Sequence, residues 1–220
     1  APLDGPAVAN CVGVVESIAG LPYAPGVAHG MRAAAAALAR AGYAVQAVEV
    51  PDIARAGELS LRLLTTDMQG QMLPAARRMG SDEIKWYFEA WFAAVTPYAT
   101  VAEYVDAQAE RNTLLRKWLL LLETHPVILM PQRTEPLLEV DEDLRDAKHL
   151  ADLLRSFAPS ATLNLMGLPS VMLPTGLYDG LPTGVQLVSA RYREDVCLAA
   201  AAAVELALGT LVQQLWAREA

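Results

Sequence analysis

The chain has 220 residues, of which 54% are hydrophobic, and it carries a formal net charge of −8. A chain of this length can bury a sizeable core in one or two domains, and its high apolar content suits a chain with an apolar face that meets another domain. The acidic balance leaves no basic surplus to neutralise phosphates, so the composition argues against an electrostatic nucleic-acid interface.

The first part of the chain alternates strand and helix patterns. An apolar run at 9–15 predicts a strand, and the Ala-rich run at 26–40 predicts a helix that Gly42 stops. Residues 43–50 predict the next strand. These three segments predict a β-α-β unit.

The middle of the chain is predicted to be mostly helical. Residues 53–66 carry a leucine face, and 68–79 form a methionine-rich stretch that Gly70 and Pro74 interrupt. Apolar residues in 101–124 recur close to a 3.6-residue period, which predicts one long helix that ends before a proline.

Ser81, followed by two acidic residues, has the pattern of a helix N-cap. The helix that it begins carries four aromatic residues, namely Trp86, Tyr87, Trp91 and Phe92. Such a stripe is more often core or interface packing than a pocket wall, and both interpretations stay open at this point.

A short apolar run at 127–130 predicts a buried strand, and 133–140 predicts an irregular connection. The acidic residues 141–143 are expected to cap the amphipathic helix predicted at 144–157.

The stretch from 161 to 205 is the most informative part of the chain. Turn formers at Asn164 and 167–169 precede a predicted strand, and Asp179-Gly180 marks a hairpin whose connection is expected to exceed two residues. The predicted elements are a strand at 170–174, a return strand at 183–189 and a helix at 194–208. With the earlier segments, they predict an α/β fold with a layered, mixed β-sheet flanked by helices.

The amino-acid sequence of this stretch contains motifs that are specific enough to indicate a family. It reads Asn-Leu-Met-Gly-Leu-Pro-Ser-Val-Met-Leu-Pro-Thr-Gly at 164–176, followed by Asp-Gly-Leu-Pro-Thr-Gly-Val-Gln-Leu-Val at 179–188. It closely resembles the carboxy-terminal part of amidase-signature hydrolases. Residues 13–52 resemble the strand-helix-strand unit that opens the second half of those enzymes. Residues 104–111 resemble the family's long helix, and 126–132 resemble the strand that follows it.

The resemblance implies that residues 1–220 are the carboxy-terminal portion of an amidase-like domain. Within it, 1–52 would be the strand-helix-strand unit, 53–125 a helical region, and 126–220 the strands, hairpin and closing helix. The family uses a serine nucleophile, a second serine and a lysine, which lie in the other half of a longer chain. Lys85, Lys117 and Lys148 have no adjacent Gly-Ser-Ser-Gly pattern, so no residue here is assigned a catalytic role and this chain alone is expected to be inactive.

By resemblance, the function is hydrolysis of a carboxylic amide to an acid and ammonia or an amine, through a serine acyl-enzyme. The implied partners are the amino-terminal half of the same enzyme and a small-molecule amide, with no nucleic acid or membrane, and a homo-oligomer is compatible with the sequence. The alternatives are a noncatalytic scaffold or partner-binding subunit, and part of an amidotransferase subunit. The sequence does not specify which amide is the substrate.

Four residues are candidates for the pocket wall: Gln132, Phe157, Asn164 and Gln186. Gln186 is the most informative of them, because a polar side chain within an apolar strand needs a partner if it is buried; an outward-facing Gln186 is the equal alternative.

Cys11 and Cys197 are far apart, lack Cys-x-x-Cys spacing and lie in apolar contexts, which is typical of buried, reduced residues in a cytoplasmic protein. The three histidines show no metal-ligand spacing. We therefore expect neither a metal nor a cofactor.

Overall fold

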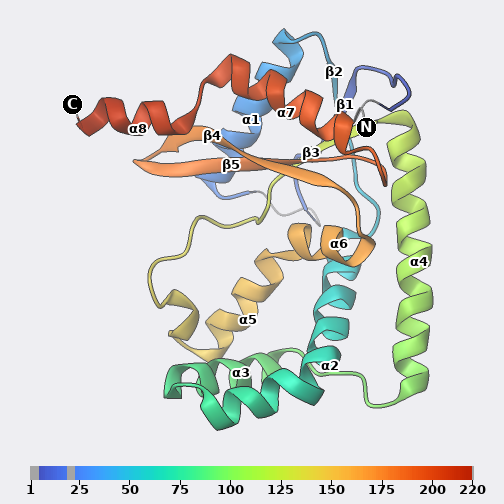
Figure 1. Cartoon of the computed structure of the whole chain (residues 1–220), viewed down its shortest axis with the longest axis vertical. Helices are drawn as coiled ribbons and strands as arrows, with labels where there is room; N and C mark the ends of the chain where they lie inside the picture. The colour runs from blue at the N-terminus through green and yellow to red at the C-terminus, as the bar shows by residue number, and fades with distance from the viewer. Residues whose placement is uncertain (1–4, 19–22, 220) are drawn as a thin grey trace. The chain divides into compact units, whose positions relative to one another are not determined.

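The computed structural model describes residues 5–18 and 23–219. The elements follow one another along the chain as β1 (Cys11–Val14), α1 (Pro25–Arg40), β2 (Ala44–Ala47), α2 (Ile53–Met79), α3 (Asp82–Ala94), α4 (Val101–Thr124), β3 (Val127–Met130), the 3-10 helix η1 (Glu142–Leu144), α5 (Ala147–Ser156), α6 (Ala158–Met166), β4 (Ser170–Tyr178), β5 (Leu181–Val188), α7 (Glu194–Leu208) and α8 (Leu211–Glu219) (Figure 1).

The chain divides into two compact units. The sheet unit comprises Ala1–Pro51, Leu115–Pro136 and Gly167–Ala220, and the helical unit comprises Asp52–Leu114 and Leu137–Met166. Each unit is discontinuous in sequence, because the chain passes from one to the other and back.

The sheet unit contains a mixed sheet with the strand order β2-β1-β3-β5-β4. Strand β1 runs parallel to β2 and to β3, whereas β5 runs antiparallel to β3 and to β4. Because β1, α1 and β2 form a β-α-β unit and the hairpin strands are antiparallel, the structure confirms the predicted α/β fold with a mixed sheet flanked by helices.

Burial explains the central position of β3. All four of its residues are buried, as expected for a strand with neighbours on both sides and apolar residues on both faces. Helices α1 and α7 pack against each other and against β4. On α4, the indole of Trp118 is fully buried and its Nε1 donates to the carbonyl of Pro51 at 2.9 Å.

The helical unit is built from two pairs of packed helices, α2 with α6 and α3 with α5. Gly57 of α2 lies so close to Ala158 of α6 that a Cβ added at Gly57 would be 2.7 Å from the Ala158 Cβ. Arg55 of α2 forms two hydrogen bonds with the carboxylate of Glu110 on α4, at 2.7 and 2.8 Å. These contacts place α2 at the centre of the unit.

Helix α2 is longer than the sequence predicts, because it continues through Gly70 and Pro74 to Met79. Pro74 removes one backbone hydrogen bond, but Met68 and Leu73 on either side of the Gly70 turn are buried. Packing of this apolar face therefore outweighs the local preference to end the helix.

The structure also differs from the prediction at one helix cap, at the hairpin turn and at the end of β4. Asp146, not 141–143, caps α5, since its Oδ1 accepts from the His149 N–H at 2.8 Å. The hairpin connection has two residues and not more: Asp179 (φ 50°) and Gly180 (φ 80°) are both left-handed, as a type I′ turn requires. Strand β4 also extends past Pro174, with an irregular register between Pro174 and Gly176.

Residues 194–213 form a stretch that is long and apolar enough to cross a membrane by length and composition. The same properties are found in core helices of water-soluble proteins, and one face of α7 is buried in the sheet unit through Val196, Cys197, Ala200, Ala201 and Val204. One such stretch is weak evidence for a membrane span.

Candidate functional site

Gln186 is buried in β5, where only 2% of its surface is exposed. Its Nε2 donates to the carbonyl oxygen of Pro131 at 2.8 Å. This bond satisfies an amide in an apolar strand and ties β5 to the backbone that follows β3. The outward-facing alternative for Gln186 is therefore wrong.

Gln132 directly follows Pro131 and has an exposed side chain. It belongs to the same unit as Gln186, so the structure brings these two predicted pocket residues into adjacent segments. Their role in a pocket stays a prediction, because the bond that joins the segments involves the backbone of Pro131.

Phe157 and Asn164 belong to the helical unit. Phe157 is the partly buried C-cap of α5, and its carbonyl accepts from the Ala161 N–H at 2.9 Å. Asn164 was expected in a turn, but it lies in the last part of α6 with an exposed side chain. The turn begins only at Gly167, whose φ of 61° suits a residue without a Cβ.

Two of the four aromatic residues of α3, Tyr87 and Trp91, are used for packing, whereas Trp86 is exposed. Trp91 donates from Nε1 to the Thr65 Oγ1 at 2.8 Å, and Tyr87 and Trp91 pack against the small core formed by Ala90, Leu150 and Leu154. A partly buried indole whose N–H has a protein partner is typical of a structural position.

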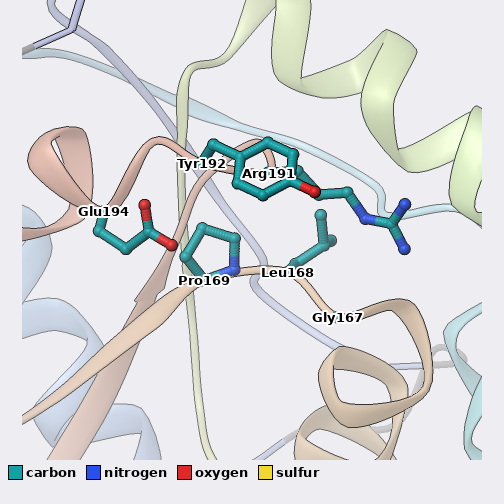
Figure 2. A pocket seen from close by; sticks show the side chains of 6 residues that line it. All are labelled: Gly167, Leu168, Pro169, Arg191, Tyr192 and Glu194. Carbon is teal, nitrogen blue, oxygen red and sulfur yellow. The ribbon is translucent and has the colours of Figure 1, made fainter.

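A pocket of about 440 Å³ lies at the open end of the β4–β5 hairpin (Figure 2). Its walls come from the turn that leads into β4 and the turn that leads from β5 to α7, and they consist of Gly167, Leu168, Pro169, Arg191, Tyr192 and Glu194. The two turns meet there because β4 and β5 are antiparallel. Sequence reasoning missed this pocket, since nothing in the spacing of its residues distinguishes it from an ordinary connection.

The adjacent N-terminus of α7 is fixed by a bidentate ion pair. Arg193 donates from Nε and Nη2 to the two carboxylate oxygens of Asp195, both at 2.9 Å. Asp195 also accepts from the Gly5 N–H at 3.0 Å. The Arg193 guanidinium, with help from the Gly5 hydrogen bond, holds the pKa of Asp195 well below its usual range.

Cys197 lies one turn into α7 and is fully buried. Burial, and then the charges of Glu194 and Asp195, raise the pKa of its thiol to about 12. Since the thiolate is the reactive form, Cys197 does not provide a nucleophile at neutral pH. Within residues 5–18 and 23–219, no group of three His, Cys, Asp or Glu side chains is arranged to hold a metal ion.

Comparisons with known proteins match most of this chain, but less than half of the proteins that it matches. The family model described as "Amidase" matches residues 9–198. An indoleacetamide hydrolase from Bradyrhizobium diazoefficiens is 33% identical over 195 residues, which is 87% of this chain and 37% of that protein. The chain thus spans less than half the length of this relative.

Two further comparisons cover different shares of this chain. The A subunit of a glutamyl-tRNA(Gln) amidotransferase from Streptococcus equi subsp. zooepidemicus is 35% identical over 106 residues, 47% of this chain and 21% of that protein. The solved structure of 6-aminohexanoate cyclic dimer hydrolase with substrate has a TM-score of 0.72 and 22% identity, and the match covers 96% of this chain and 47% of that one. The structural likeness shows a shared fold.

The mixed sheet and its flanking helices define the class as an α/β fold, which the chain shares with the solved hydrolase structure. The chain belongs to the amidase-signature family.

Proposed function

We propose that this chain is the carboxy-terminal portion, over 1–220, of an enzyme that hydrolyses a carboxylic amide to an acid and ammonia or an amine. The observation that carries the proposal is the 33% identity to an indoleacetamide hydrolase across 87% of the chain. An activated serine in the other part of the enzyme would attack the amide carbonyl and form an acyl-enzyme, which water then hydrolyses. A lysine there would assist the serine.

In this proposal the chain supplies support and part of the pocket wall. The Gln186 bond to Pro131 would hold the segment that carries Gln132 against the sheet. Phe157 and Asn164 stay candidates for the pocket wall. The partner would be the amino-terminal half of the same enzyme, and the edge strand β4 offers it a place to continue the sheet, because β4 pairs with β5 and stands last in the strand order of the described residues.

The substrate would be a small-molecule amide, and indole-3-acetamide is the first to test because of the relative's activity. We propose a cytoplasmic location, supported by two cysteines that are free in the structure.

The test is ammonia release from a panel of carboxylic amides, measured with the complete natural gene product and with the 220-residue chain alone. We expect activity for the complete product and none for the 220-residue chain. If the natural product ends with these residues and releases no ammonia, the amidase proposal is wrong and a noncatalytic scaffold or partner-binding subunit takes its place.

The identity to amidotransferase A subunits supports a second candidate, in which the chain is part of a subunit that delivers ammonia to an acylated transfer RNA. The match covers 47% of the chain, much less than the match to the hydrolase. Ammonia transfer from glutamine to glutamyl-tRNA by the complete protein would favour this candidate, whereas glutamine-independent hydrolysis of simple amides favours the first.

A further inference from the structure

The pocket at the open end of the β4–β5 hairpin has rims that are fixed by the fold. The carbonyl of Pro169 accepts from the Ser189 N–H at 3.2 Å and from the Cys197 thiol at 3.6 Å. On the other rim, the Arg193 N–H donates to the Ala190 carbonyl at 3.1 Å and closes the turn. The hollow between the two turns is therefore preformed.

Tyr192 is held in an unfavourable backbone conformation at the pocket. Its φ is 62°, in the left-handed region where a residue with a Cβ is strained. Its side chain is 87% exposed. Strained residues of this kind concentrate at ligand-binding sites, and an exposed aromatic ring at the wall of a pocket provides a face for a ligand.

The charged residues beside Tyr192 divide into two sets. Arg193 and Asp195 satisfy each other, with 19% and 15% of their side chains exposed, and Arg193 also donates to the Pro6 carbonyl at 2.7 Å. Arg191, which also interacts with another part of the chain, and Glu194 line the pocket. Figure 2 shows the Arg191 guanidinium and the Glu194 carboxylate on opposite sides of the Tyr192 ring.

These groups select a ligand with two opposite charges. A guanidinium has five N–H donors and recognises carboxylates well, also when it serves another partner. A carboxylate pairs with an ammonium group, and Glu194 is itself favoured by its position in the first turn of α7. Between the charges, Tyr192 on one side and Leu168 and Pro169 on the other offer apolar surface for methylene groups.

We propose that this pocket binds a small zwitterion, an amino acid whose carboxylate pairs with Arg191 and whose ammonium group pairs with Glu194. Its test requires no catalytic activity. Because Glu194 and Tyr192 are exposed, each ion pair contributes modestly and binding is in the millimolar range.

The test is calorimetric or NMR titration of the complete protein with straight-chain ω-amino acids from glycine to 6-aminohexanoate. For the best of these, matched acids and amines of the same length carry only one of the two charges. We expect one chain length to bind about fivefold more tightly than either singly charged analogue, since each exposed pair contributes up to that factor. Equal binding of the zwitterion and the carboxylate would overturn the proposal in favour of a simple anion site.

Substitutions of the pocket residues test whether the zwitterion binds at this site. Arg191→Gln and Glu194→Gln should each weaken zwitterion binding about threefold to fivefold, and Tyr192→Gly should weaken it while relieving the backbone strain. Arg40→Gln, at an exposed position in the last turn of α1, is the matched control and should bind as the parent does. Unchanged binding in both pocket charge variants would overturn the proposal.

Discussion

At the scale of single residues, burial decides which polar side chains are structural. Gln186 is buried and bonded to the Pro131 carbonyl, whereas Gln132 and Asn164 are exposed. The sequence indicated the importance of Gln186, because an amide in an apolar strand needs a partner. The positive φ of Tyr192 could not be predicted, because the residue type alone does not indicate a left-handed conformation at a residue other than glycine.

Replacement of Gln186 by leucine should destabilise the protein. The substitution keeps the side chain's size but leaves the buried Pro131 carbonyl without its donor, which costs about 1–3 kcal/mol. Urea unfolding measures the loss, and Gln69→Leu at an exposed position of α2 is the control. Equal stability of the two variants would show that water replaces the lost donor.

The ion pair between Arg193 and Asp195 should make stability depend on pH. Because the Arg193 guanidinium depresses the pKa of Asp195 in the folded state, the pair stabilises the protein above the unfolded pKa of about 4, and this contribution is lost as the pH falls toward the folded pKa. The stability difference between the parent and Asp195→Asn should therefore be largest near neutral pH and shrink below about pH 4.

Urea unfolding between pH 7 and pH 3 tests this expectation. Asp106→Asn, at an exposed position on α4, controls for the general loss of a negative charge. A difference for Asp195→Asn that stays constant across the range would mean that packing, and not charge, accounts for its effect.

At the scale of elements, local patterns predict helices and strands well where packing and propensity agree. The bounds of α4, β3 and α7 follow from apolar periodicity and from flanking proline or acidic residues. Helix α6 was missed, since 158–166 contains turn formers at both ends and is held in place by packing on α2. Packing against distant segments is the information that a single sequence lacks.

Helix α2 offers a test of that packing within one element. Gly57→Ala should destabilise the protein by about 1–3 kcal/mol, because the new methyl group would be 2.9 Å from the backbone Cα of Ala158, which cannot rotate away. Gly70→Ala in the same helix has nothing within 4 Å of the added Cβ, so it should stabilise by up to about 1 kcal/mol.

Thermal unfolding of the two alanine variants is the measurement. Both gain the same helix propensity, so a difference between them reports the contact between α2 and α6. If both variants become more stable, the two helices have room to separate.

At the scale of the whole molecule, the sheet unit presents a long edge. Strand β4 has nine residues and stands last in the strand order of the described residues, and Met172 within it is 60% exposed. Exposed edge strands favour pairing with further chains.

The 220-residue chain alone should self-associate through β4. Met172→Lys places a charge on the edge and should reduce association, as charged residues do on natural edge strands. Sedimentation velocity over a range of concentrations measures it, with Met79→Lys on α2, where Met79 is 71% exposed, as the matched control. An equal effect of both lysines would indicate general solubility and not strand pairing.

The path of the chain between its two units also has a consequence for biosynthesis. It leaves the sheet unit after Pro51, returns at Leu115, leaves again after Pro136 and returns at Gly167. Since β5 lies between β3 and β4 in the sheet, a ribosome must release residues 170–188 before the sheet can close around its most buried strand. Both units therefore remain incomplete until most of the chain has been made, and chaperones would meet them together as a single unfinished substrate.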